Sequence, residues 1–301
     1  MNISVKIGGM LFKNPVTVAS GTFGHSERYY DLEEVKRLGA IVPKTVTFHP
    51  QTGNPPVRIV ETASGMINAI GIENPGIDAF IADKLPALKS IRVPLIISIS
   101  GKDEEQWVGI IEKLNTQEGI TAVELNLSCP NLKNKVLVAQ DAQATMQLVK
   151  QMKALSKFPI IAKLSPNVTD IAQIAQAAED GGADAVSLVN TFQAMAIDVK
   201  TRRSRIGNIT GGLSGPAIRP IAVYMVRRVA ASVKIPVIGM GGIMNAQDAL
   251  EFLIAGATMV AVGTANFINP RAPLDVLEGI EAFMKENKID DINEIIGSLK
   301  V

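Results

Sequence analysis

The chain has 301 residues, of which 47% are hydrophobic and 20% are charged. This length suits one large domain, such as an α/β barrel, or two small ones. The formal net charge of +1 gives no sign of a nucleic-acid partner or an acidic surface as a target. The single cysteine excludes an internal disulfide, and it excludes an iron–sulfur cluster held by thiolates of this chain alone.

The sequence also argues against a membrane protein and against a metal site. Lys6 and Lys13 interrupt the first apolar residues, so no signal peptide is predicted. No apolar run approaches the about 18 residues that a spanning helix needs. The two histidines, His25 and His49, are too isolated to suggest zinc. We therefore expect a cytoplasmic protein without a metal.

Short apolar runs recur along the chain and begin in two alternating ways. Some follow a proline, which is tolerated at the first position of a strand, and others follow a glycine that suits the end of a helix. The first kind comprises 16–19, 95–97, 160–162 and 237–238, and the second 40–42, 122–123, 185–186 and 259–260. Runs that are apolar on both faces and joined by helices indicate a parallel sheet. Eight of them predict a single (β/α)8 or TIM barrel spanning 1–301; an open doubly wound sheet would usually show G-x-G-x-x-G after its first strand.

Several segments lie outside this repeat. Residues 3–12 contain Gly8-Gly9 and predict a hairpin that closes the barrel floor. The connections after the second, fourth and sixth strands are long, and long loops on a rigid scaffold are usually functional. The clearest helix is expected over 170–179, with Thr169 as its N-cap.

The fourth predicted strand runs directly into a polar loop that carries the only cysteine. Apolar and polar residues alternate over 123–126, and Pro130 ends the strand. Cys129 therefore lies with Asn126 and Asn131 at a carboxyl end, where barrels do their chemistry. The thiol is either buried filler or, once its thiolate is favoured, a general base. No histidine lies near Cys129 in the sequence, so the sequence does not predict a hydrolytic triad.

Polar residues and glycines follow the other strands at the same end of the barrel. They are Ser20-Gly21, Lys44-Thr45, Ser98, Lys163, Asn190-Thr191, Gly239-Met240-Gly241-Gly242 and Gly263-Thr264. The glycines after the last two strands leave backbone N–H groups uncovered ahead of a helix, which predicts a phosphate site. The alternative is that they make tight turns.

Two lysines are predicted on buried strands, where a charged group needs an anionic partner or an altered pKa. Lys44 or Lys163 alone could form a Schiff base or a core ion pair. Together they suit negative charge on a flat ligand, such as a reduced flavin ring. Asn68, Asn126 and Asn190 add carboxamides that both donate and accept, as an imide or amide heterocycle requires, although asparagine is also a common turn residue.

An ordered set of motifs extends over nearly the whole chain. It comprises 13–15 with 19–21, 53–56, 68–72 with 74–76, 126–131, 163–167, 212–216 and 239–243. In this order the motifs resemble the class 1 dihydroorotate dehydrogenases, most closely the catalytic subunit of the NAD-linked class 1B. The resemblance implies an FMN enzyme that oxidises (S)-dihydroorotate to orotate in de novo pyrimidine (UMP) biosynthesis. Cys129 would take the C5 proton while hydride passes from C6 to flavin N5.

The resemblance also implies the binding residues and the partners. The cofactor would contact Ser20, Gly21, Lys44, Thr45, Ser98, Asn126, Lys163, Val189, Gly215, Gly241, Gly242, Gly263 and Thr264. The substrate would contact Lys44, Asn68, Ala69, Ile70, Gly71, Ile72, Asn126, Asn190 and Thr191. Electrons would reach NAD+ through a second subunit that carries FAD and a 2Fe–2S cluster, in a heterotetramer built on a homodimer core. The Arg202–Arg205 run is interpreted as a solvated loop, with docking as the alternative.

The chain departs from the family pattern at two places. The family usually has Asn where Ser98 stands, and it has glycines in the loop after the cysteine, whereas 133–141 has none. Glycine-poor loops are stiffer, so we expect this loop to move differently. Competing interpretations are a dihydropyrimidine dehydrogenase-type subunit, a class 1A fumarate-linked enzyme, a flavin-free lyase or isomerase with a Schiff-base lysine, and a catalytically inactive barrel kept as a scaffold.

Overall fold

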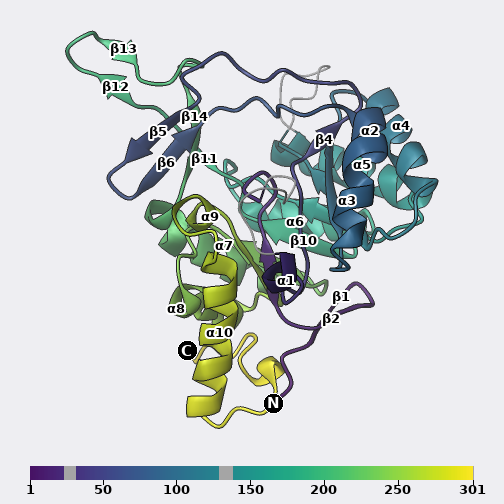
Figure 1. Ribbon diagram of the computed structural model, residues 1–301, viewed down its shortest axis with the longest axis vertical. Coiled ribbons are helices and arrows are strands. Elements are labelled where there is room, and N and C mark those ends of the chain that lie inside the picture. Colours follow the sequence, from purple (N-terminus) through teal and green to yellow (C-terminus); the bar gives the residue numbers. More distant parts are fainter. Residues whose placement is uncertain (24–31, 129–137, 301) are drawn as a thin grey trace.

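The computed structural model describes residues 1–23, 32–128 and 138–300, and its centre is an eight-stranded parallel sheet (Figure 1). The strand order is β3-β16-β15-β10-β9-β8-β7-β4. The bounds are β3 Val16–Val18, β4 Val46–Thr47, β7 Ile96–Ser100, β8 Ala122–Asn126, β9 Ile160–Lys163, β10 Ala185–Leu188, β15 Val237–Met240 and β16 Met259–Val262. The predicted parallel sheet of alternating strands and helices is confirmed.

The first barrel strand, β3, and the second, which includes β4, lie at opposite ends of this order, and hydrogen bonds connect them. The Gly39 amide donates to the Val16 carbonyl at 2.9 Å, and Thr17 Oγ1 donates to the Ala40 carbonyl at 2.9 Å. The sheet therefore curls round onto itself, as a barrel requires.

The second strand differs from the prediction, which ended it at residue 42. Ile41 forms an isolated bridge with Leu95, and the ladder resumes at β4. Pro43 lies between them and has no N–H to donate, which accounts for the interruption. Lys44 and Thr45 consequently lie inside an interrupted strand, not beyond its end.

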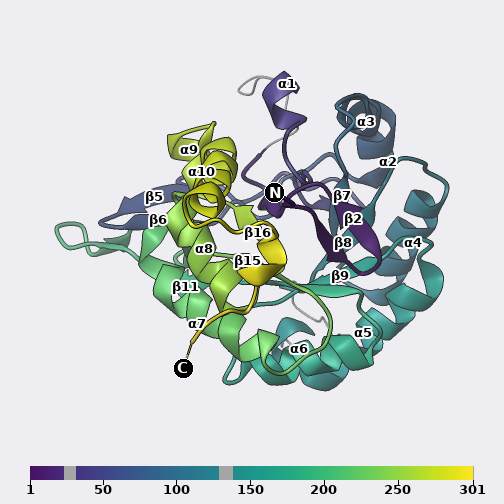
Figure 2. The ribbon, with the colours of Figure 1, turned by 90° about the horizontal axis from the view of Figure 1, so that it is seen from below.

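Helices surround the sheet and bury their apolar faces against it, as the view from below shows (Figure 2). They are α1 Leu32–Val35, α2 Ile77–Ala79, the π-helix η1 Phe80–Lys84, α3 Leu85–Ser90, α4 Glu104–Asn115, η2 Val138–Gln140, α5 Ala142–Leu155, α6 Ile171–Asp180, η3 Pro216–Ile218, α7 Arg219–Ala230, α8 Ala246–Ala255, α9 Ala265–Ile268, α10 Ala272–Glu286 and η4 Ile292–Glu294. Asp170, rather than the predicted Thr169, caps α6, because its carboxylate accepts from the Ala172 amide. Among the described residues, no helix combines the length and the apolar character needed to cross a membrane.

The predicted N-terminal hairpin is confirmed. Strands β1 (Val5–Ile7) and β2 (Met10–Phe12) pair in antiparallel fashion around the glycine turn. A Cβ on Gly8 would lie 2.6 Å from the Cβ of Asp184, which directly precedes β10. The hairpin tip therefore packs at the amino-terminal end of the barrel strands, opposite the end that carries the predicted site.

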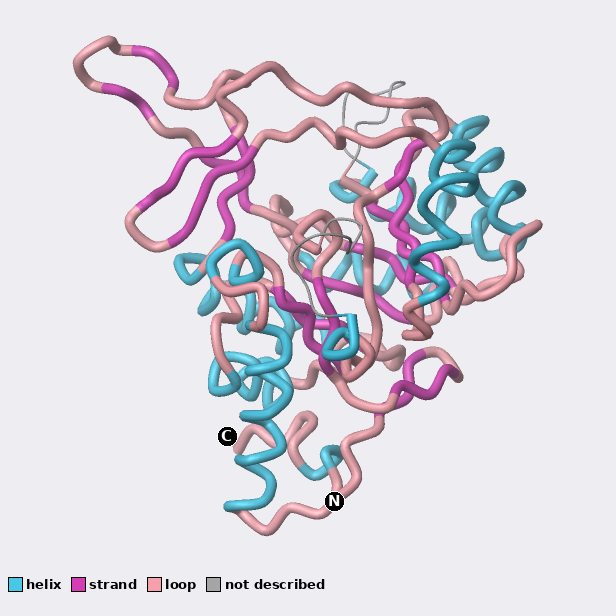
Figure 3. The backbone as a smooth tube through the Cα atoms, viewed as in Figure 1, coloured by secondary structure: helices cyan, strands magenta, loops and turns pink. Residues whose placement is uncertain are grey.

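The long connections after the second and sixth barrel strands, expected as loops, form a second sheet instead (Figure 3). Its antiparallel order is β11-β14-β6-β5, with bounds β5 Ile59–Thr62, β6 Gly65–Asn68, β11 Phe192–Ala194 and β14 Gly211–Ser214. Strands β12 (Ile197–Asp198) and β13 (Arg203–Ser204) extend it as an outer hairpin, which holds part of the arginine run. β14 is rich in glycine and has a low intrinsic strand propensity, so its strand conformation depends on the tertiary contact with β6.

Candidate active site

A cavity of about 890 Å³ opens at the carboxyl ends of the barrel strands. This volume lies within the range of sites for small molecules and cofactors. The cavity is lined by Ser20, Gly21, Lys44, Thr45, Asn68, Ala69, Ile70, Gly71, Ile72, Asn126, Lys163, Val189, Asn190, Thr191, Gly241, Gly242, Gly263 and Thr264. All of these residues were predicted from the sequence. Their individual binding roles stay predictions.

One end of the cavity is lined by backbone, where β15 and β16 end. Gly242 has φ +77°, a left-handed conformation that favours glycine. A Cβ at this position would lie 2.7 Å from the carbonyl oxygen of Gly215. Gly215 thus stands directly behind Gly242 and does not itself line the cavity. Thr264 Oγ1 donates to Ser214 Oγ at 2.9 Å across the same end. The close approach behind Gly242 leaves no room for a side chain, so the loop presents bare backbone to the cavity, and this fits a phosphate group.

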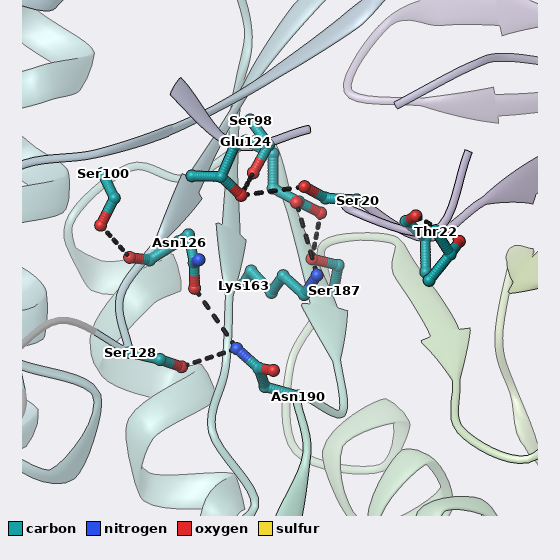
Figure 4. A network of polar contacts seen from close by, with 12 residues as sticks. Ser20, Thr22, Ser98, Ser100, Glu124, Asn126, Ser128, Lys163, Ser187 and Asn190 are labelled. Carbon is teal, nitrogen blue, oxygen red and sulfur yellow. Dashed lines mark hydrogen bonds and ion pairs between the residues drawn. The ribbon is translucent and has the colours of Figure 1, made fainter. Parts of the chain in front are cut away.

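The opposite wall carries a buried ion pair between neighbouring strands (Figure 4). Lys163 Nζ, on β9, lies 3.7 Å from Glu124 Oε1, on β8. The two residues are 6% and 3% exposed. Ser187 Oγ, on β10, donates to Glu124 Oε2 at 2.9 Å. Sequence reasoning expected an anionic partner for Lys163 but did not identify Glu124, although the alternation of β8 marks it as a polar residue inside a buried strand.

Lys44 adds a second ammonium group to this wall. Burial is the main cause that lowers the pKa of Lys44 below its ordinary value, and the positive charge of Lys163 lowers it further. Glu73 opposes both effects by raising the pKa. The cavity therefore holds two cationic side chains close together, and a bound anion would relieve their mutual repulsion.

Three hydroxyl groups form a chain that leads from the cavity into the barrel interior. Ser20 Oγ lies 2.9 Å from Thr45 Oγ1, which lies 3.0 Å from Ser98 Oγ. Ser98 is fully buried and is absent from the cavity lining. The serine therefore reaches the cavity through Thr45, not directly.

Carboxamides line the region between the lysines and the second sheet. Asn190 Nδ2 donates to Ser128 Oγ at 2.8 Å and lies 3.3 Å from Asn126 Oδ1. Asn68 Nδ2 donates to the Gly212 carbonyl at 3.2 Å, which ties β6 to β14 at the cavity edge. Lining residues without a predicted role include Ser128 and Asn167. Both lie in the motifs 126–131 and 163–167. Their positions just beyond β8 and β9 could have identified them as lining residues.

Cys129, the predicted base, lies outside the described residues with Pro130 and Asn131. Its neighbour Ser128 lines the cavity. From the glycine-poor segment 133–141, the structure describes the last four residues, where Gln140 donates its side-chain amide to the Asn167 carbonyl at 2.8 Å. Within the described ranges, no group of three or more His, Cys, Asp and Glu side chains could hold a metal ion.

The barrel places a glycine-lined end and a cationic, amide-rich wall in one cavity at the carboxyl ends of its strands, which is where barrel enzymes have their active sites. The family model described as dihydroorotate dehydrogenase matches residues 2–284. The chain therefore belongs to the dihydroorotate dehydrogenase family, and the resemblance found in the sequence is confirmed. The expectation of an oxidoreductase is confirmed with it.

Full-length relatives carry a more specific name. The chain is 52% identical over 301 residues to a protein of Lachnoclostridium phytofermentans named dihydroorotate dehydrogenase B (NAD(+)), catalytic subunit, and the match covers all of both chains. A protein of the same name from Thermoanaerobacter pseudethanolicus is 50% identical, again over all of both chains. A third, from Geotalea uraniireducens, is 48% identical over 99% of this chain and 98% of the relative.

Proposed function

We propose that the protein is the catalytic subunit of an NAD-linked dihydroorotate dehydrogenase, which oxidises (S)-dihydroorotate to orotate in de novo pyrimidine biosynthesis with one FMN per chain. The observation that carries this proposal is that one cavity joins the glycine cradle at Gly242 to Lys44 and Lys163. The name shared by full-length relatives at about 50% identity supports it.

The residues present fit the cofactor. Gly241, Gly242, Gly263 and Thr264 would hold the phosphate, with Gly215 behind them, and Ser20, Gly21, Thr45, Asn126, Lys163 and Val189 would surround the ring and the ribityl chain. When bound, FMN supplies the acceptor for the hydride that leaves C6 of the substrate. The uncovered backbone amides of the cradle would bind phosphate without a cationic side chain.

The substrate would occupy the wall that carries Lys44. Its ammonium group would pair with the carboxylate of dihydroorotate, and the carboxamides of Asn68, Asn126 and Asn190 would match the donors and acceptors of the ring. The backbone of 69–72 and Thr191 would complete the contact. Cys129 would take the C5 proton, which the neighbouring carbonyl acidifies, and a positioned base typically contributes ~10²–10⁴ in rate.

The electrons would leave through a second protein. The chain has one cysteine and cannot alone supply thiolates for an iron–sulfur cluster. The name of the relatives, catalytic subunit, supports a separate electron-transfer subunit, for which we propose FAD and a 2Fe–2S cluster with NAD+ as the final acceptor. We propose a heterotetramer on a homodimer core, in the cytoplasm, with 1–301 as one domain.

The decisive experiment is an absorption spectrum of the purified protein, followed by anaerobic addition of dihydroorotate. A yellow protein that bleaches supports both the flavin and the substrate. Bleaching by dihydrouracil but not by dihydroorotate would move the assignment to a dihydropyrimidine dehydrogenase-type subunit. A protein that stays colourless after reconstitution with FMN would overturn the flavin assignment, and trapping by borohydride would then test Lys44 and Lys163 as Schiff-base nucleophiles.

A further inference from the structure

Glu124 carries a buried carboxylate for which the proposed reaction has no direct role. Its Oε2 accepts from Ser187 Oγ at 2.9 Å, and Ser187 is itself fully buried. Its Oε1 lies 3.7 Å from Lys163 Nζ and accepts no hydrogen bond from any described residue. Lys163 lines the cavity, whereas Glu124 does not. The carboxylate is thus paired with a cavity-lining ammonium group but does not itself line the cavity.

Stability alone does not account for this pair. Two charges removed from water carry a desolvation cost that can exceed their mutual attraction, and apolar residues of similar volume often replace such pairs without loss. A carboxylate with one unpaired buried oxygen is still less favourable. The arrangement therefore indicates a role directed toward whatever Lys163 contacts.

The geometry of the pair suits a lysine that is held in place but still able to bind. A separation of 3.7 Å is an ion-pair contact and too long for a good hydrogen bond. The three ammonium donors of Lys163 therefore remain able to turn toward a ligand. Glu124 is fixed from the other side by Ser187, so it attracts the ammonium group from a defined point.

We propose that Glu124 is a positioning residue, which holds Lys163 at the cavity wall and offsets part of its positive charge, and so lowers the preference of the site for the reduced flavin. This inference rests on the proposed function, because it assumes that the flavin ring lies beside Lys163. The sign follows from charge: reduction places negative charge on the ring, a neighbouring cation stabilises it, and a carboxylate paired with that cation weakens the effect.

Glu124→Gln tests the proposal with little change of size, and its amide oxygen can still accept from Ser187. The reduction potential of the reconstituted FMN protein is measured by equilibration with a reference dye and an enzymatic reductant, without dihydroorotate. We expect the affinity ratio of reduced to oxidised flavin to rise by about tenfold, a potential about 30 mV higher for a two-electron couple. An unchanged potential in a protein with a lowered Tm would overturn the proposal and leave Glu124 a purely structural role.

Three further variants separate positioning from other effects. Ser187→Ala keeps both charges. Its ratio of reduced to oxidised flavin affinity should therefore stay within about twofold of wild type, which corresponds to a potential within about 9 mV. The Glu124→Gln shift should shrink in a Lys163→Met background; persistence of the full shift would overturn the route through Lys163. If Glu124→Gln does not fold, Glu124→Asp withdraws the carboxylate, and an unchanged potential would count against the proposal.

The failure of this inference is distinguishable from failure of the proposed function. A wild-type protein that binds FMN but is not reduced by dihydroorotate would overturn the substrate assignment and leave the potential measurement intact. A wild-type protein that binds no FMN would overturn both.

Discussion

The two ends of the cavity reach their binding capacity by opposite means. At the ends of β15 and β16 the lining is backbone, and Gly242 matters because it has no side chain. At the ends of β8 and β9 the lining is made of side chains, with Lys163 and Asn126 placed by neighbouring strands that pair them directly in register. In the proposed function, the first end would hold a phosphate, whereas the second would restrict which ring can lie there.

The two ends also carry different costs. The glycine end depends on a left-handed φ that Gly242 adopts readily and that is unfavourable for other residues. The side-chain end carries a desolvation penalty, because the charged groups of Lys44, Lys163 and Glu124 are removed from water. Substitutions at the two ends should therefore change different measured properties. Those at the glycine end should reduce cofactor retention, and those at the side-chain end should reduce the reaction rate or anion binding.

The largest effect is expected from Cys129→Ser. The variant should keep FMN and orotate binding but lose ~10²–10⁴ in the rate of flavin reduction at neutral pH, because a serine hydroxyl is a far weaker base than a thiolate. Anaerobic stopped-flow reduction by dihydroorotate measures this rate. Ser128→Ala, at the adjacent position that lines the cavity, is the matched control and should lose much less. A near-normal rate in Cys129→Ser would remove this cysteine as the base.

Gly242→Ala changes the glycine end of the cavity and should reduce cofactor retention. The added Cβ would meet the Gly215 carbonyl at 2.7 Å in a backbone with φ +77°, so strain of about 1–3 kcal/mol is expected. This corresponds to a loss of FMN affinity on the order of ten- to a hundredfold. Titration of the apoprotein with FMN, followed by flavin fluorescence, measures it.

Gly9→Ala is the control for backbone strain alone. Gly9 has φ +83° in the turn of the β1–β2 hairpin, and nothing lies within 4 Å of an added Cβ. This variant should lower Tm slightly and leave the FMN affinity unchanged. Equal loss of FMN affinity in both variants would show that general destabilisation, rather than the cradle, releases the cofactor.

Lys44→Met should weaken orotate binding by about tenfold or more, because a hydrogen bond to a charged group contributes about 1.5–3 kcal/mol. Burial and Lys163 lower the pKa of Lys44 in the folded protein. Wild-type orotate affinity should therefore fall as pH rises through that lowered pKa, below the ordinary value of 10.5. Flavin difference spectra across this range measure the affinity. Lys102→Met, an exposed lysine just after β7, should match wild type.

The same lowered pKa predicts the opposite trend for folding stability. Between the folded pKa of Lys44 and the ordinary value, the unfolded chain binds more protons than the folded one. The contribution of Lys44 to the free energy of unfolding should therefore rise with pH through this window. Lys44→Met should remove that part of the pH dependence, and denaturant unfolding of the apoprotein at several pH values would detect it. An identical pH dependence in the variant would contradict the assignment.

The sequence predicted the barrel and part of the cavity lining for a physical reason. Prolines and glycines mark where strands begin, and the carboxyl ends of parallel strands share one edge, so Asn126, Lys163 and Asn190 could be grouped without coordinates. The second sheet could not be predicted in this way. It depends on β6 meeting β14, and the contact of Asn68 with Gly212 joins residues 144 positions apart in a segment with little strand propensity.

Strand register explains the two remaining differences at the site. The Glu124–Lys163 pair follows from the alignment of β8 with β9, in which Asn126 lies opposite Lys163 and Glu124 two positions away on the same face. Ser98 was expected at the mouth of the barrel because it follows a predicted strand, and the family resemblance implied its contact with the cofactor. In the structure it is two residues inside β7, and Thr45 separates it from the cavity.

Ser98→Ala should therefore have the smallest effect. Its hydroxyl bonds to Thr45 Oγ1 at 3.0 Å in a fully buried setting, so removal should cost about 1 kcal/mol of unfolding free energy. FMN affinity should change by less than about threefold, because Thr45 still bonds to Ser20 and still faces the cavity. Thr45→Val, which removes the hydroxyl that lines the cavity, should weaken FMN binding more. The opposite ranking in parallel FMN titrations would mean that Ser98 contacts the cofactor directly, and that the hydroxyl chain reorganises when the cofactor binds.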